Sequence, residues 1–360
     1  MSQLNFNENF YSHYYTRDGF ITALEQLVGS ENENISIVPF GSEINPKEYI
    51  SNIQSGSRFV EIIKQYEGLR LYKLTHNIER GENKRIESGY FFIYEHQQYD
   101  NVYIAFTIED SNFFNDELVP LLNSYYPDLI FTYLKNNIFK NLIEGFKKAN
   151  SIKEIIVSRA SQKVRKEFGR MPAVTWNKSS LEDAFNWVYE NDGYFKSLQF
   201  NAFISNNISV NIFINRQGFL RTDYYFKKVF ESFVEPICEL INDQYKLFSK
   251  RSRKDRQDLS VKPLIIQYDS EMFEEVEENS VFIEAIRNID SASVSVLHGN
   301  PYVHLSVLDY YDGSTFDIWI LNSKQIAIVP QMKGSVAAIK RLINHIFDSY
   351  AEGEIKDYKE

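Results

Sequence analysis

Two patterns of apolar residues alternate along this chain, one typical of strands and one of helices. Residues 1–60 follow neither pattern and predict irregular chain with short helices. Strand-like runs follow at 69–74, 90–94 and 102–108. Apolar residues then recur at four-residue spacing and predict a helix over 138–149. These elements predict an N-terminal α+β domain over residues 1–150.

Residues 151–250 show the alternation more clearly. Ser180 and Asp183 have the spacing of a helix N-cap and open an apolar-faced helix. Strands are expected at 152–157, 198–204, 208–214 and 219–221, and a long helix at 224–249. Pro236 should kink that helix, because proline cannot donate the helical hydrogen bond. We expect a middle α+β domain here.

The last third of the chain begins after a polar, charged segment at 251–260 that is typical of a linker. Beyond it, strands are expected at 264–267, 291–297, 303–308, 315–321 and 326–329, with helices at 271–287 and 335–350. Asp312-Gly313 predicts a type I′ hairpin turn. Residues 261–360 should therefore form an antiparallel-sheet and helix domain.

The expected fold class is α+β, with antiparallel hairpin sheets each backed by long helices. Residues 151–249 and 261–350 share one order of elements: strand, helix, hairpin strands and long helix. The shared order allows two readings. It can reflect two related α+β modules after the N-terminal domain, or coincidence, because a hairpin followed by a helix is a common arrangement.

Composition narrows the class of protein. With 360 residues, 28 Phe and 24 Tyr, the chain can bury more than one core. Its single cysteine, Cys238, excludes an internal disulfide, fits a reducing cytosol and is expected to be a buried, inert thiol. Neither a signal peptide nor an 18-residue apolar run is evident, so we expect a cytoplasmic protein without a membrane partner. The abundance of Asn, Ile, Lys, Phe and Tyr is typical of a bacterial source.

Motifs for common chemistries are missing from the sequence. It has no phosphate-binding loop, no dinucleotide fingerprint, no serine-hydrolase elbow and no zinc-protease helix. We therefore expect no cofactor, including no nucleotide, and assign no catalytic residues. An enzyme whose site is not encoded in a short motif stays open, although the sequence favours a protein that is not an enzyme.

Three local features have both a functional and an ordinary interpretation. His298 and His304 flank a turn and could share a site, yet no third metal ligand is evident, so we assign no metal. Two acid-x-Lys triplets, at 82–84 and 354–356, fall outside predicted strands and indicate surface residues rather than a nuclease centre. The acidic run at 271–278 is either a dock for a basic partner or the solvated face of a helix.

Charge is the most informative feature. The chain carries a formal net charge of −10, yet residues 135–262 hold 23 Lys+Arg against 14 Asp+Glu. The remaining residues hold 16 basic and 35 acidic side chains. Clustered Lys and Arg neutralise phosphates and give affinity without sequence preference. The middle region therefore predicts a surface for an anionic partner, unless the acidic flanks neutralise it from within.

The candidate nucleic-acid-binding residues form two clusters and one pair that flanks a turn between them. They are Lys163, Arg165, Lys166, Arg170, Arg216, Arg221, Lys250, Arg251, Arg253 and Lys254. Trp176 and Tyr224 lie near them in the sequence and could stack on bases. The ordinary alternative is a solvated linker and ion pairs with acidic neighbours.

Three functions follow from these observations. The first is a non-catalytic nucleic-acid-binding component of a bacterial complex, with anti-phage defence as an extension based on composition alone. The second is a protein-binding or assembly subunit that uses acidic flanks and aromatic surfaces. The third is the enzyme without a short motif.

Overall fold

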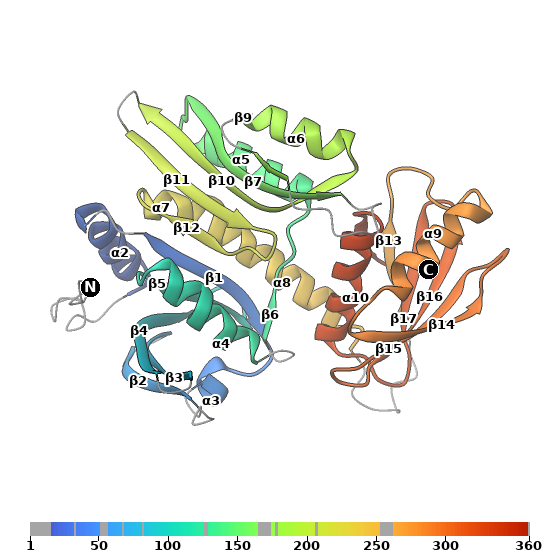
Figure 1. Ribbon diagram of the computed structural model, residues 1–360, viewed down its shortest axis with the longest axis horizontal. Helices are drawn as coiled ribbons and strands as arrows, with labels where there is room; N and C mark the ends of the chain where they lie inside the picture. Colours follow the sequence, from blue (N-terminus) through green and yellow to red (C-terminus); the bar gives the residue numbers. More distant parts are fainter. Residues whose placement is uncertain are drawn as a thin grey trace. The chain divides into compact units, whose positions relative to one another are not determined.

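Two antiparallel sheets organise the part of the chain that the computed structural model describes, and the α+β class is confirmed (Figure 1). The described residues are 16–31, 34–50, 57–66, 68–80, 83–125, 129–164, 174–176, 179–205, 208–252 and 262–358. Their contacts separate two compact units. Unit 1 holds most of the chain up to Asn242, and unit 2 holds Asp243–Glu360 with the short segment Asp192–Tyr194.

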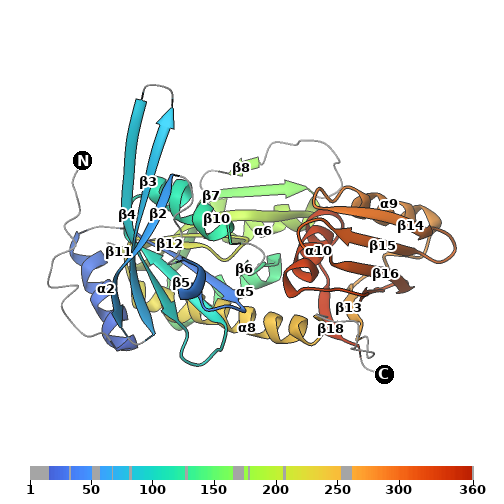
Figure 2. The same ribbon diagram turned by 90° about the horizontal axis from the view of Figure 1, so that it is seen from below.

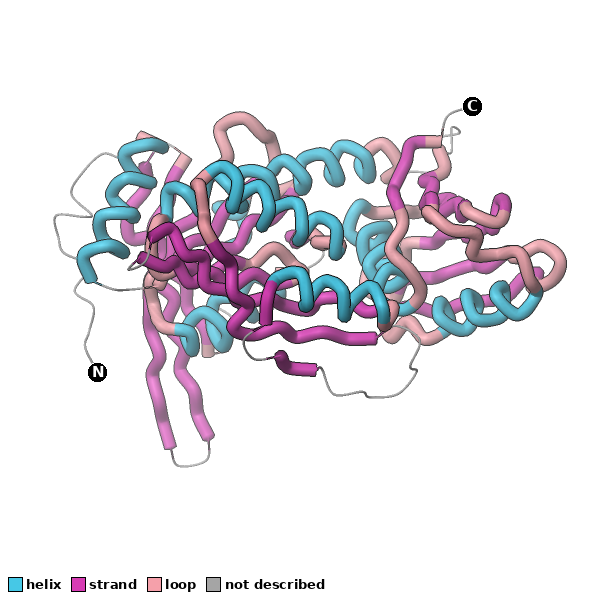
Figure 3. The backbone as a smooth tube through the Cα atoms, turned by 90° about the horizontal axis from the view of Figure 1, so that it is seen from above, coloured by secondary structure: helices cyan, strands magenta, loops and turns pink. Residues whose placement is uncertain are grey.

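Unit 1 is built on a twelve-stranded sheet. Its strands are β1 (Ile35–Ser42), β2 (Arg58–Tyr66), β3 (Leu69–Arg80), β4 (Asn83–Glu95), β5 (Val102–Thr107), β6 (Leu129–Phe131), β7 (Glu154–Val164), β8 (Val174–Trp176), β9 (Ser179–Ser180), β10 (Gly193–Ser205), β11 (Ile208–Asn215) and β12 (Leu220–Thr222). The main order is β2-β3-β4-β5-β1-β12-β11-β10-β7-β8, while β6 pairs with β1 and β9 with β7. Figures 2 and 3 show the β3–β4 hairpin extending away from the rest of this sheet.

The pairing of β1 with β12 joins regions that the sequence divides at residue 150. Ile37 lies opposite Leu220, and Ser36 lies opposite Arg221. Backbone hydrogen bonds therefore run from the predicted N-terminal domain directly into the predicted middle domain. Within the described residues, both regions share one sheet.

The prediction of irregular structure before residue 60 is wrong at β1, a buried central strand that contains Pro39. Proline cannot donate a ladder hydrogen bond and is normally confined to sheet edges. On one side of β1, however, β12 pairs only with residues 35–37 and β6 only with residues 40–42. Pro39 occupies the gap between these two partners, so its missing N–H leaves no bond unmade there.

Five helices of the described residues pack against one face of this sheet. They are α2 (Arg17–Glu31), α5 (Asn136–Ala149), α6 (Leu181–Glu190), α7 (Phe226–Val229) and α8 (Glu235–Ser249). Their apolar side chains form one core with β1, β5, β7, β10 and β11. The predicted helix over 138–149 and the N-cap at Ser180 are confirmed, since the Ser180 hydroxyl accepts from the Asp183 N–H at 3.1 Å.

The predicted long helix after β12 is divided by a π-helical segment. Between α7 and α8, residues Phe230–Val234 form the π-helix η2, and Pro236 follows at the second position of α8. A π-turn widens the helix and leaves one position of the backbone hydrogen-bond ladder unused. The N–H group that proline lacks is therefore not needed at that position. Cys238 of α8 is fully buried, as predicted.

The opposite face of the sheet is covered only in part. Helices α3 (Pro46–Ile50) and α4 (Val119–Asn123) and the π-helix η1 (Phe113–Leu118) pack a second core against β1 to β5. Figure 1 shows α4 in front of β5 and β1. On β10 and β11 the residues pointing to this same side are half-buried or exposed wherever the structure describes their side chains. As far as the described residues go, unit 1 therefore has an open sheet face over β7, β10, β11 and β12.

Unit 2 contains a six-stranded sheet in the order β14-β15-β16-β17-β13-β18. Its elements are β13 (Leu264–Gln267), α9 (Val276–Arg287), β14 (Ala292–His298), β15 (His304–Asp309), β16 (Thr315–Asn322), β17 (Gln325–Pro330), α10 (Val336–Ser349) and β18 (Glu354–Asp357). Its first strand, β13, pairs with the last hairpin strand, β17, whereas β7 in unit 1 pairs with the first hairpin strand, β10. The shared order of elements is thus not a shared sheet topology.

Three details of unit 2 differ from the prediction. Helix α9 begins at Val276 rather than at 271, because Glu275 and Glu278 form a capping box there. The Asp312-Gly313 turn is not type I′, since only Gly313 has a positive φ. The acid-x-Lys triplet at 354–356, predicted to fall outside strands, lies on the edge strand β18, because Glu354–Asp357 pair with β13. No helix in the described ranges is long and apolar enough to cross a membrane.

Candidate functional site

Two of the ten predicted nucleic-acid-binding residues are buried. The Arg216 guanidinium stacks 4.1 Å from the Tyr133 ring centre, and Arg216 Nη1 donates to the Phe195 carbonyl at 3.3 Å. Arg251 is 3% exposed, pairs with Asp357 and donates to the Leu247 carbonyl at 2.6 Å. Both guanidinium groups serve the packing of their own units.

The other described candidates reach the surface. Lys163 and Lys250 are exposed, the first at the end of β7 in unit 1 and the second after α8 in unit 2. Arg221 of β12 is half-buried; burial lowers the pKa of its guanidinium, against the opposite effect of Asp110. Five candidates lie outside the described residues, and their role stays a prediction: Arg165, Lys166, Arg170, Arg253 and Lys254.

The open sheet face carries amide and aromatic side chains on β10 and β11. Asn211 Nδ2 donates to Asn201 Oδ1 at 2.7 Å, and Gln199 Nε2 donates to Asn211 Oδ1 at 3.0 Å. Phe213 lies opposite Gln199, and Phe203 lies opposite Ser209. All of them except the exposed Ser209 are half-buried.

Basic residues border this face. On β7 both Val157 and Ala160 are buried, so the alternation of buried and outward side chains shifts by one residue between them. From there to the end of the strand the outward side chains are those of Arg159, Ser161 and Lys163. Both Arg159 and Lys163 are exposed. On the other side of the face, Arg221 lies opposite Phe213 and marks the border with the covered half of the sheet. Lys163 and Arg221 are therefore the two candidates that the sheet places on or beside one surface.

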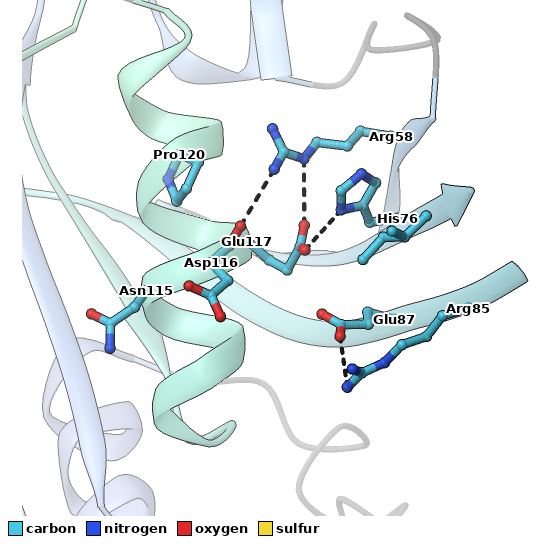
Figure 4. A pocket seen from close by; sticks show the side chains of 9 residues that line it. Arg58, His76, Arg85, Glu87, Asn115, Asp116, Glu117 and Pro120 are labelled. Atoms are coloured by element: carbon cyan, nitrogen blue, oxygen red, sulfur yellow. Dashed lines mark hydrogen bonds and ion pairs between the residues drawn. The ribbon is translucent and has the colours of Figure 1, made fainter. Parts of the chain in front are cut away.

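A separate pocket of about 710 Å³ lies in unit 1 between the β2–β3–β4 strands and η1–α4 (Figure 4). Its walls are mostly charged or polar: Arg58, His76, Ile78, Arg85, Glu87, Asn115, Asp116, Glu117 and Pro120. Arg85 pairs with Glu87 at 2.7 Å. The volume falls in the range of small-molecule sites in proteins.

Glu117 organises the polar groups of this pocket. Its carboxylate is 3% exposed and accepts from His76 Nδ1 at 2.7 Å and from Arg58 Nε at 3.4 Å. Figure 4 shows Arg58 and His76 converging on Glu117 from the strand side. On the opposite edge of the imidazole, His76 Nε2 lies 3.1 Å from Ser57 Oγ. Serine, histidine and carboxylate thus form one continuous hydrogen-bonded chain.

The direction of these bonds follows from the carboxylate. An ionised carboxylate can only accept, so Nδ1 of His76 carries the proton that it donates to Glu117. In the neutral imidazole Nε2 is then an acceptor and receives the Ser57 hydroxyl proton. This is the arrangement in which a histidine can remove a proton from a serine.

Local structure holds the chain of groups in place. Arg58 and His76 are directly opposite on β2 and β3, so the hairpin register brings Ser57 to the imidazole. Glu117 lies on the π-helix η1, whose Phe113 packs over Gly89 of β4. A Cβ at residue 89 would lie 2.5 Å from Phe113 Cε2, so only glycine allows η1 this close to the sheet.

The predicted histidine pair of unit 2 does meet across the β14–β15 hairpin. His298 lies opposite His304, with ring centres 6.3 Å apart. His304 stacks on Trp319 at 3.7 Å, and its Nε2 lies 3.1 Å from Asp317 Oδ2 at an angle unsuited to a hydrogen bond. No group of three metal-binding side chains occurs in the described residues.

Sequence reasoning missed the pocket because its residues are far apart along the chain. Ser57, His76 and Glu117 are brought together by a hairpin register and by a π-helix, neither of which leaves a short motif. The sequence did indicate part of the open face. The alternation of polar and apolar residues in 208–214 predicts a strand with one solvated side.

Comparison with known proteins assigns neither site. No protein-family model matches the chain, and no curated protein matches it either.

Proposed function

We propose that this protein is a nucleic-acid-binding component of a bacterial complex, and that the open face of unit 1 holds a single strand without acting on it chemically. The observation that carries the proposal is the uncovered sheet surface with Phe203 and Phe213 among amide side chains. Proteins that bind single strands combine such stacking surfaces with a positively charged border. Anti-phage defence stays a hypothesis from composition.

The aromatic residues supply the stacking. Phe203 lies four positions along β10 from Gln199, the residue opposite Phe213, which is a distance of ~13 Å along the strand. Two bases of an extended strand can therefore stack on the two rings. The amides of Asn201 and Asn211 lie between the rings and can donate to and accept from base edges.

The basic border supplies affinity for the backbone. Arg159 and Lys163 stand on β7 and Arg221 on β12, so phosphates on either side of the stacked bases meet a cation. Only a few phosphates are neutralised in this way. Binding should therefore depend on salt moderately, while stacking contributes a large share of the free energy.

Titration of a fluorescent 20-nucleotide single strand tests the proposal. With three phosphate contacts, we expect the dissociation constant to rise by about 20-fold between 50 and 200 mM salt. Phe203→Ala with Phe213→Ala should weaken binding by at least about tenfold, because each lost stacking contact costs about 1–3 kcal/mol. Lys163→Gln should reduce the salt dependence.

The matched control is Tyr310→Ala, which removes a 63% exposed aromatic from unit 2 and should leave the affinity unchanged. Thermal melting of each variant checks that unit 1 stays folded. An affinity for the strand that survives the double phenylalanine substitution contradicts the proposal, as does the absence of binding at 50 mM salt.

A second candidate function, a protein-binding or assembly subunit, is favoured by the surface of unit 2. Several large apolar residues there are strongly exposed, among them Leu297, Tyr302, Tyr310 and Leu321. Exposed apolar patches often mark protein interfaces. Size-exclusion chromatography of the protein co-expressed with the products of neighbouring genes distinguishes this candidate. A stable heteromer supports the assembly function if the double substitution Tyr302→Ser with Tyr310→Ser disrupts it. A lone monomer in every pairing counts against this function.

A further inference from the structure

We propose that Ser57, His76 and Glu117 form a hydrolytic site at the pocket of unit 1, in which Ser57, hydrogen-bonded to the pocket-lining His76, is the nucleophile, His76 the general base and Glu117 the residue that orients the histidine. The geometry points to this role because the two hydrogen bonds, 3.1 and 2.7 Å long, connect hydroxyl, imidazole and carboxylate in the required order. This activity is additional to the binding of a nucleic-acid strand.

Burial distinguishes the three roles. Ser57 is exposed, as a nucleophile that must meet a substrate has to be. The His76 side chain is 17% exposed and Glu117 only 3%, so the orienting carboxylate is the most shielded. A carboxylate in that position fixes the tautomer of the histidine and stabilises the imidazolium that forms during reaction.

The walls of the pocket suggest the class of substrate. Apart from Ile78 and Pro120, the lining residues are polar or charged. Arg58 directly follows Ser57, and its guanidinium lies in the pocket, where it can balance negative charge that develops on a carbonyl oxygen (Figure 4). A small polar ester fits these features better than an apolar one.

The reaction balances with water as the only co-reactant. Ser57 Oγ attacks the ester carbonyl while His76 Nε2 takes the hydroxyl proton, giving a tetrahedral oxyanion. The oxyanion collapses and expels the alcohol, which leaves with that proton, and an acyl-serine remains. Water, deprotonated by His76, then attacks the acyl group. The carboxylic acid departs and Ser57 regains its proton.

A π-helix at this position is a second, independent pointer. Short π-helical segments are rare and occur frequently at functional sites. The π-helix η1, Phe113–Leu118, directs the Glu117 side chain toward His76. The Glu117 carboxylate also accepts a hydrogen bond from Arg58 Nε. The same helix provides Asn115 and Asp116 to the pocket wall.

Labelling by a fluorophosphonate tests the proposal, because such probes react with activated serines and not with ordinary ones. The native full-length protein should be labelled, and peptide mass spectrometry should place the adduct on Ser57. Ser57→Ala should abolish labelling. His76→Gln should slow it by about 100-fold or more, the usual contribution of a general base.

The matched control is Ser88→Ala, which removes another exposed serine of the same sheet and should leave the labelling rate unchanged. Native protein that stays unlabelled overturns the proposal, as does an adduct that persists in Ser57→Ala. Strand binding serves as the folding control. A Ser57→Ala protein that binds the single strand normally shows that loss of labelling does not come from unfolding of unit 1.

Discussion

The unfolding free energy of unit 2 should rise by about 2 kcal/mol between pH 7 and pH 9, and Lys340→Met should remove most of this rise. Lys340 of α10 is 5% exposed, and its Nζ donates to Gln244 Oε1 at 3.0 Å. Desolvation lowers the pKa of this ammonium from 10.5 to about 7. The effect is large because the Gln244 amide is neutral, and no negatively charged group pairs with Lys340 among the described residues.

The sign follows from proton binding. The unfolded chain keeps the proton on Lys340 up to about pH 10, whereas the folded chain releases it near pH 7. Between these values the unfolded state binds more protons, so stability increases with pH. At pH 7 the methionine variant should therefore be more stable than the native protein, by several kcal/mol.

Urea denaturation followed by Trp319 fluorescence measures this effect in unit 2 alone, in a background in which Trp176 and Trp187 are replaced by Phe. Lys324→Met is the matched control, since Lys324 is 42% exposed. It should keep the full pH dependence. If Lys340→Met also keeps it, the ammonium is not desolvated in the folded protein.

Asp309→Ala should lower the unfolding free energy of unit 2 by about 3–5 kcal/mol, which is the second largest effect that we expect. Both oxygens of Asp309 accept from Arg341, with Nε to Oδ2 at 2.7 Å and Nη2 to Oδ1 at 2.8 Å. The side chains are 4% and 13% exposed, respectively. Removing the carboxylate leaves a desolvated guanidinium and also deprives the Tyr311 N–H of its acceptor.

The same denaturation experiment measures this loss. Glu354→Ala is the control, because the Glu354–Lys356 pair is exposed on both sides and should contribute less than about 1 kcal/mol. Adding Arg341→Met to Asp309→Ala should recover part of the stability, because it removes a desolvated guanidinium whose next carboxylate, Asp312 Oδ2, lies 3.7 Å from Nη2. A loss below 1 kcal/mol in Asp309→Ala would show that solvent reaches this pair.

Local patterns predicted much of the fold. The alternation on β11 and the four-residue spacing on α5 correctly gave a strand and a helix. The same rules failed at β1, where Pro39 and Gly41 are turn residues by composition but are tolerated by a gap between two partner strands. That gap depends on pairing with residues far away in the sequence, which no local pattern contains.

The candidate sites depend on tertiary structure still more strongly. A count of charges does not distinguish Lys163, which is exposed, from Arg216 and Arg251, which are buried against their own units. Similarly, Ser57 and His76 resemble ordinary polar residues until the β2–β3 register brings them together. Burial and register decide these cases, and both come from the packed sheet.

The most direct test of the central claim is photo-crosslinking of the native protein to a single strand that carries 5-iodouracil. Ultraviolet irradiation followed by peptide mass spectrometry identifies the residues that contact the bases. Our account predicts adducts on Phe203 or Phe213 of the open face, and their loss in the double alanine variant. Adducts confined to peptides of unit 2, or no adducts at a strand concentration that saturates binding, would contradict it.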